Sequence, residues 1–136
     1  MQELADEEFQ HARQVEVFMR QYPRAAPEPG GDKYAQGLRK LWNVRGRDNF
    51  LDMLLVCSLI EARSAERFRL LADCARGTTL GSFYEDLYAS EVNHYLLFVG
   101  LSNDFFGEAP TLARLDEMRA AEAELIRSLP AGARMH

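Results

Sequence analysis

Apolar residues recur every three or four positions along almost the whole chain, which is the spacing of one face of an α-helix. The pattern predicts a first helix that ends before Pro23 and a long helix over roughly residues 48–76. Further helices are predicted over about 82–101 and 111–128, and a short one over about 34–42. No stretch alternates as a strand does, so the sequence predicts an all-α protein.

Residues that break or cap helices mark the predicted boundaries. Three prolines and a Gly-Gly pair in residues 23–32 predict a long connection after the first helix. Gly77 is placed to end the long helix. Ser82 and Glu85 match the S-x-x-E capping box, which predicts that the next helix begins there.

Length and composition favour one compact helical domain over residues 1–136. Apolar residues make up 47% of the chain and charged residues 27%, which is close to a soluble globular average. No stretch reaches the ~18 consecutive apolar residues of a membrane span, so we expect no membrane partner. The N-terminal segment has neither the basic start nor the apolar block of a secretory signal, which predicts a cytoplasmic protein. The net charge of −5 argues against nucleic-acid binding by bulk charge, although a local basic segment can still contact phosphates.

The two cysteines, Cys57 and Cys74, are far apart and form no C-x-x-C pair. The sequence therefore predicts neither a zinc site nor a disulfide framework, and we expect reduced thiols in or near the core.

Ionisable residues interrupt the apolar stripes at positions where leucine or alanine would ordinarily pack. Glu8 and His11 form an E-x-x-H on the first helix, Glu61 lies on the long helix, and Glu91 and His94 form a second E-x-x-H on the next. Residues three apart are neighbours on a helix surface. Burying an unpaired carboxylate costs several kcal/mol, so three glutamates that face one core require protons, cationic partners or a metal as compensation. A metal explains all three together.

One Glu plus one E-x-x-H, used twice, is the ligand set of ferritin-like di-iron and di-manganese bundles. The chain offers five of the six ligands, because only seven residues precede Glu8. We therefore expect an N-terminally incomplete ferritin-like bundle with a long crossover connection. On the final helix, Glu122 lies beside the apolar stripe, where a solvated position is the favoured interpretation over a replacement ligand.

Two segments resemble a specific family. The segments are LLVCSLIEARSAERFRLLA and FYEDLYASEVNHYLLFVGL, preceded by the E-E-x-x-H that ends at His11. They are similar to the tRNA 2-methylthio-isopentenyl-adenosine hydroxylases, over nearly the whole chain. The resemblance implies that Glu8, His11, Glu61, Glu91 and His94 bind two iron ions. It also implies O2-dependent hydroxylation of the prenyl side chain of a tRNA nucleoside, with an electron-donor protein as a further partner. The family's first helix and its Glu have no counterpart here.

Several basic residues are candidates for binding tRNA phosphates, with a merely solvated loop or a helix-surface ion network as the alternatives. They are Lys33, Arg39, Lys40, Arg45 and Arg47 after the connection, and Arg63 and Arg67 beside Glu61. Tyr84, Tyr88 and Tyr95 lie on or beside the Glu91 stripe, where core packing is expected over substrate stacking. Leu54, Leu87 and Phe98 are expected to line the site.

Two other functions remain open from the sequence. One is a different ferritin-like di-iron activity, such as a peroxidase or an iron-handling protein, with the same ligands and no tRNA substrate. The other is a metal-free helical interaction module that forms a homodimer through the groove left by the absent helix. Measuring the iron content of the protein separates the metal-free module, which binds none, from a di-iron enzyme.

Overall fold

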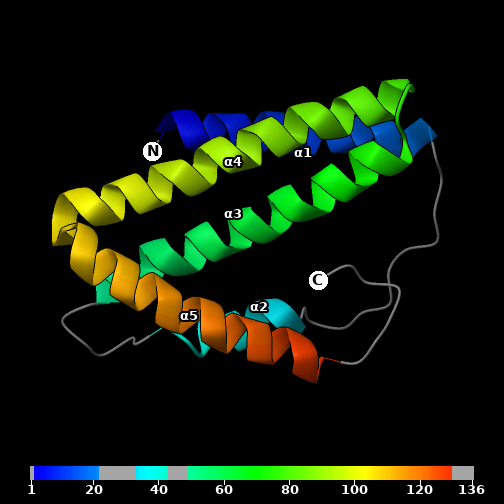
Figure 1. Cartoon of the computed structure of the whole chain (residues 1–136). Helices are drawn as coiled ribbons and strands as arrows, with labels where there is room; N and C mark the ends of the chain where they lie inside the picture. Colours follow the sequence, from blue (N-terminus) through cyan, green and yellow to red (C-terminus); the bar gives the residue numbers. More distant parts are fainter. Residues whose placement is uncertain (1, 22–32, 43–48, 130–136) are drawn as a thin grey trace. The chain divides into compact units, whose positions relative to one another are not determined.

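The structure is a computed structural model that describes residues 2–21, 33–42 and 49–129, without the side chains of residues 3 and 21. All regular structure in these ranges is α-helical, as the sequence predicts (Figure 1). The helices are α1 (Gln2–Gln21), α2 (Lys33–Arg39), α3 (Asn49–Cys74), α4 (Thr79–Phe106) and α5 (Glu108–Ser128). The chain divides into two compact units, Met1–Gly31 and Asp32–His136. The predicted connection over residues 23–32 lies outside the described residues, and no described helix is long and apolar enough to cross a bilayer.

In the part of the first unit that the structure describes, the helix is α1, which ends before Pro23 as predicted. Its sequence places Leu4, Glu8, His11, Val15 and Phe18 on one stripe at three- and four-residue steps. This stripe therefore carries the predicted E-x-x-H on one face of the helix.

The second unit is built on a hairpin of two long helices, α3 and α4, which run side by side (Figure 1). Gly77 takes a positive φ of 80° in the turn, and Thr78 follows in an extended conformation. The Thr78 hydroxyl accepts a hydrogen bond from the backbone N–H of Gly81 at 3.0 Å, so it caps α4. The predicted start at Ser82 is therefore wrong, because Thr78 caps the helix one turn earlier.

The hairpin turn requires a glycine at position 81. Gly81 is buried, and a Cβ there would clash with the backbone carbonyl oxygen of Ala75. The close approach of the two helix ends is possible because this side chain is absent.

Helix α5 packs against α2, α3 and α4, and it begins at Glu108. The predicted start at Thr111 is wrong because Pro110 lies inside the first turn, where its missing N–H would have had no helical partner. Helix α2 is shorter than predicted: it ends at Arg39, and a turn follows in which the N–H of Leu41 donates to the Leu38 carbonyl at 2.9 Å.

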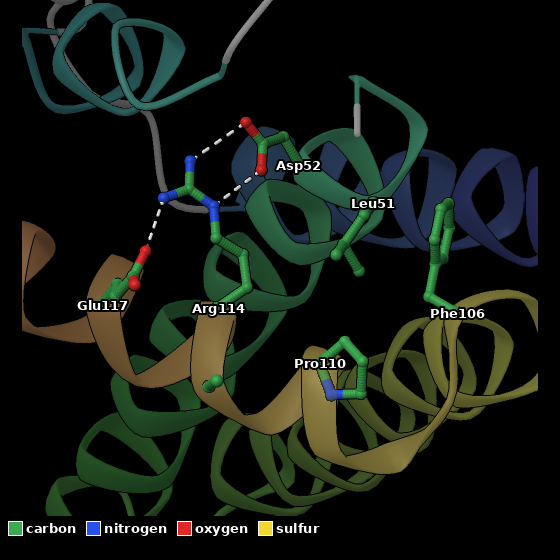
Figure 2. Close-up of a pocket in the computed structure, with 7 residues that line it drawn as sticks. Leu51, Asp52, Phe106, Pro110, Arg114 and Glu117 are labelled. Carbon is green, nitrogen blue, oxygen red and sulfur yellow. Dashed lines mark hydrogen bonds and ion pairs between the residues drawn. The ribbon is translucent and has the colours of Figure 1, made fainter. Parts of the chain in front are cut away.

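The core of the second unit combines residues from α2, α3 and α5. Its buried members are Tyr34, Leu38, Leu51, Leu55, Val56, Leu59, Leu115 and Met118. Beside it, an open pocket carries the ion pair between Asp52 of α3 and Arg114 of α5 (Figure 2). The pair joins α5 to the hairpin, with the Asp52 carboxylate buried and the Arg114 guanidinium partly exposed.

Candidate metal centre

Both ionisable residues of the E-x-x-H of α4 are buried. Glu91 is 7% exposed and His94 is 3% exposed, and a carboxylate oxygen of Glu91 lies within 4.8 Å of a ring nitrogen of His94. The three-residue spacing puts both side chains on one face of the helix. The Glu91 carboxylate and the His94 imidazole, which are both favourably hydrated in water, are therefore held close together with little access to solvent.

Helix α3 adds a second carboxylate to this pair. Oε2 of Glu61 lies 4.0 Å from Nδ1 of His94, and the Glu61 side chain is 16% exposed. The hairpin brings these groups together although 33 positions separate them in the sequence. The structure thus brings together Glu61, Glu91 and His94, which the sequence predicts as ligands.

The second ring nitrogen of His94 has a neighbour of its own. Nε2 lies 3.4 Å from the hydroxyl oxygen of Ser90, one turn earlier on α4. Ser90 was not among the predicted site residues, although its position four residues before His94 on the same helix face was the available signal.

The donor set fits iron. Carboxylate oxygens and imidazole nitrogens are ligands that iron accepts in proteins, and a cation among two buried or half-buried carboxylates offsets the cost of their burial. Glu8 and His11, the other two predicted ligands, lie on one face of α1 in the first unit. That all five residues bind metal stays a prediction.

Cys57 lies one turn before Glu61 on α3 and is half-buried. Burial raises the pKa of its thiol, and the negative charge of Glu61 raises it further. Cys57 is therefore held as a neutral thiol, as expected for a near-core cysteine. Cys74, in contrast, is exposed at the end of α3, where a near-core position was predicted.

Glu122 of α5 is buried at 7% exposure, so the solvated position expected for it is wrong. The Tyr34 hydroxyl donates to its Oε1 at 2.6 Å, and Nη2 of Arg63 lies 3.4 Å from the same oxygen. Burial raises the pKa of Tyr34, and the hydrogen bond to Glu122 raises it further. These partners belong to α2 and α3, and they compensate the buried charge of Glu122 without a metal.

The predicted phosphate-binding residues differ in accessibility. Lys33, Arg39 and Lys40 are exposed on and after α2, and Arg67 is half-buried on α3. Arg63 also forms an ion pair with Glu66, which confirms the helix-surface ion network as the interpretation for Arg63. Arg45 and Arg47 lie outside the described residues.

The three tyrosines near Glu91 are half-buried, so the core packing expected for them is wrong in part. Tyr84 stacks on Phe68 with ring centres 6.1 Å apart. The hydroxyl of Tyr95 accepts a hydrogen bond from Arg119 at 2.7 Å, and the guanidinium of Arg69 lies over the ring of Tyr88.

The apolar residues predicted to line the site are buried. Leu54 and Leu87 are each 2% exposed, and Phe98 is 6% exposed. Leu87 lies one turn before Glu91 and Phe98 one turn after His94, so the sequence places them on the same helical stripe as the two ionisable residues.

Comparison with known proteins points to one family. The model of the family described as tRNA-(MS[2]IO[6]A)-hydroxylase (MiaE) matches residues 1–136. A tRNA 2-(methylsulfanyl)-N(6)-isopentenyladenosine(37) hydroxylase of Pseudomonas putida is 36% identical over 136 residues, which is all of this chain and 66% of the relative. A protein of the same name from Salmonella typhimurium is 32% identical over 133 residues, covering 98% of this chain and 48% of the relative. The chain thus spans less than two thirds of the length of both relatives.

A solved structure has the same fold. It is the protein called "Protein 43 with aldehyde deformylating oxygenase activity from Synechococcus", with a TM-score of 0.84 and 31% sequence identity. The match covers 96% of this chain and 64% of that one. The all-helical architecture is therefore of the ferritin-like kind that the sequence predicts.

Proposed function

The chain belongs to the MiaE family, and from this premise we propose that it is a di-iron enzyme that hydroxylates the isopentenyl group of 2-methylthio-N6-isopentenyladenosine in tRNA, with O2 as co-substrate. The observation that carries the proposal is the burial of Glu91 and His94 beside Glu61. Burying two carboxylates beside an imidazole costs free energy in a metal-free core, whereas the same residues are the usual ligands of a metal site.

Five residues would hold the two iron ions: Glu61, Glu91 and His94 of the second unit, and Glu8 and His11 of α1. The proposed role of the two α1 residues is supported by their E-x-x-H spacing on one stripe and by the family match over residues 1–136. Bound iron would supply the activation of O2, which protein side chains cannot perform.

The other side chains of the site would protect and orient the reaction. Leu54, Leu87 and Phe98 would exclude water from the reacting carbon; their burial on the helices that carry Glu61, Glu91 and His94 supports this role. Hydroxylation puts one oxygen atom into the C–H bond and reduces the other to water. That reduction consumes two electrons, so we include an electron-donor protein in the proposal.

For the substrate we propose contacts from exposed basic residues to tRNA phosphates. Lys33, Arg39 and Lys40 are accessible for this role, and Arg45, Arg47 and Arg67 are further candidates. Arg63 is the weakest candidate because Glu122 and Glu66 already engage its guanidinium. A tRNA substrate would also favour a cytoplasmic location.

Iron analysis tests the metal part of the proposal. We expect about two irons per chain after anaerobic reconstitution with Fe(II), and a clear loss in Glu91→Ala. Glu85→Ala is the matched control, because Glu85 is an exposed carboxylate on the same helix. No bound iron in the unmodified chain would overturn the proposal and favour a metal-free helical module.

Nucleoside analysis tests the substrate. tRNA from cells with the gene should contain the hydroxylated nucleoside, and tRNA from cells without it should contain the unhydroxylated one. The second candidate is a ferritin-like oxygenase with another substrate, which the 31% identity to the Synechococcus protein favours. Bound iron with an unchanged nucleoside ratio would select that candidate.

A further inference from the structure

Ser90 and Glu61 lie near different nitrogens of the same imidazole. The Ser90 hydroxyl oxygen is 3.4 Å from Nε2 of His94, and Oε2 of Glu61 is 4.0 Å from Nδ1. The two nitrogens of an imidazole point to different sides of the ring. The position of His94 therefore gives each nitrogen a neighbour of different chemistry.

We propose that Ser90 is a positioning residue, whose hydroxyl accepts the Nε2–H of His94 and so presents the Nδ1 lone pair toward Glu61 for iron. The inference rests on the proposed di-iron site and assigns Ser90 a role in it.

The tautomer of His94 decides between this arrangement and a metal-free one. A neutral imidazole has one N–H and one lone pair, and a hydroxyl can accept or donate. If Ser90 accepts from Nε2, the lone pair is on Nδ1 and faces the carboxylate of Glu61, as a shared metal requires. If Ser90 donates to Nε2, an N–H points at Glu61, which suits a simple hydrogen-bonded pair.

Burial makes the contact effective. His94 is 3% exposed, so water has little access to its ring, and Ser90 is only partly buried one turn earlier. A metal-binding histidine generally donates its other N–H to a fixed acceptor, and loss of that acceptor typically weakens metal binding by about 10- to 100-fold. Ser90 has the position and the chemistry of such an acceptor.

The test measures Fe(II) affinity by competition with a chelator in the whole chain. Ser90→Ala should bind iron about 10-fold or more weakly, and Ser90→Thr, which keeps the hydroxyl, should recover most of the affinity. Ser102→Ala is the matched control: Ser102 is a buried serine of α4 whose hydroxyl donates to the Phe98 carbonyl at 2.9 Å. It should leave the iron affinity unchanged, whatever it does to stability.

A second readout follows the ring itself. In the zinc-loaded protein, nitrogen-15 NMR should find the His94 proton on Nε2, with a signal that shifts in Ser90→Ala and stays in Ser102→Ala. A proton on Nδ1, or an unchanged iron affinity in Ser90→Ala, would overturn the role of Ser90 while leaving the di-iron function standing. Failure of the unmodified chain to bind iron would overturn both.

Discussion

Both carboxylate oxygens of Asp52 are bound by the guanidinium of Arg114, at 2.8 Å from Nε and 3.0 Å from Nη2. Nη1 of Arg114 donates to Glu117 at 2.8 Å (Figure 2). Nη2 also donates to the Leu41 carbonyl at 3.4 Å. Hydrogen bonds to Asp52 and then to Glu117 raise the pKa of Arg114, so it stays charged. One side chain of α5 thus ties together α3 and the turn after α2.

Arg114→Ala should destabilise the protein by about 3–5 kcal/mol, because it leaves the carboxylate of Asp52 buried without its cation. Urea unfolding followed by circular dichroism measures the loss. The control is Arg127→Ala on the same helix, whose pair with Glu124 is exposed and should contribute less than about 1 kcal/mol. Equal losses in the two variants would contradict the structural role of the Asp52 pair.

Gly81→Ala should destabilise the second unit by about 1–3 kcal/mol, since the added methyl group meets the backbone of Ala75. Gly100→Ala in the same helix is the comparison, because a Cβ there has open space around it. It should stabilise the protein by about 0.5–1 kcal/mol. Thermal unfolding of the two variants should therefore shift in opposite directions, and a shared direction would be inconsistent with the tight turn.

The buried phenol of Tyr34 should make stability fall at alkaline pH. Its pKa is raised in the folded chain above the ordinary 10.0 by burial and by Glu122. Below pH 10 the phenol is protonated in both states, and this contribution to stability is fully present. Above pH 10 the unfolded chain loses the proton first, so the free energy of unfolding falls by up to about 1.4 kcal/mol per pH unit.

Urea unfolding between pH 9 and 11.5 measures this slope, and Tyr34→Phe should remove the part of the fall that Tyr34 causes. The variant will also be less stable at neutral pH, since Glu122 loses a buried hydrogen bond worth about 1–3 kcal/mol. The slope of the free energy of unfolding against pH, and not its value at neutral pH, therefore tests the role of Tyr34. An equally steep fall in Tyr34→Phe would show that another group is responsible.

Iron should stabilise the folded chain through Glu91. At a free Fe(II) concentration 100 times the Kd, binding to the folded state alone adds about 2.7 kcal/mol to the free energy of unfolding. Anaerobic thermal unfolding with and without Fe(II) should show the shift in the unmodified chain and in Glu85→Ala, but only a small one in Glu91→Ala. A full shift in Glu91→Ala would remove Glu91 from the proposed ligands.

Local periodicity was sufficient to predict most of the fold and much of the candidate site. The spacing of Glu91 and His94 places both on one helix face, whatever surrounds the helix. Their burial beside Glu61 follows because the stripe that contains them is otherwise apolar. The helix positions and the shared face of Glu91 and His94 depend on the spacing of nearby residues, which can be read from the sequence.

The polar networks depended on residues far away in the sequence. Glu122 receives its hydrogen bond from Tyr34, 88 positions earlier, and Asp52 meets Arg114 62 positions later. No helical spacing reveals such partners, so Glu122 was expected in water. The start of α4 was missed for a different reason: Thr78 and Ser82 both suit a helix cap, and the position of Gly77 favours the first.

The α3–α4 hairpin makes the distance along the chain between Glu61 and Glu91 as important as the identity of the two residues. One inserted or deleted residue within either arm would rotate everything beyond it by about 100° and shift it by about 1.5 Å. A carboxylate that now faces the interior would then face the solvent. Homologous chains with the same chemistry should therefore vary at the exposed positions of these arms, but they should keep the number of residues between the two glutamates.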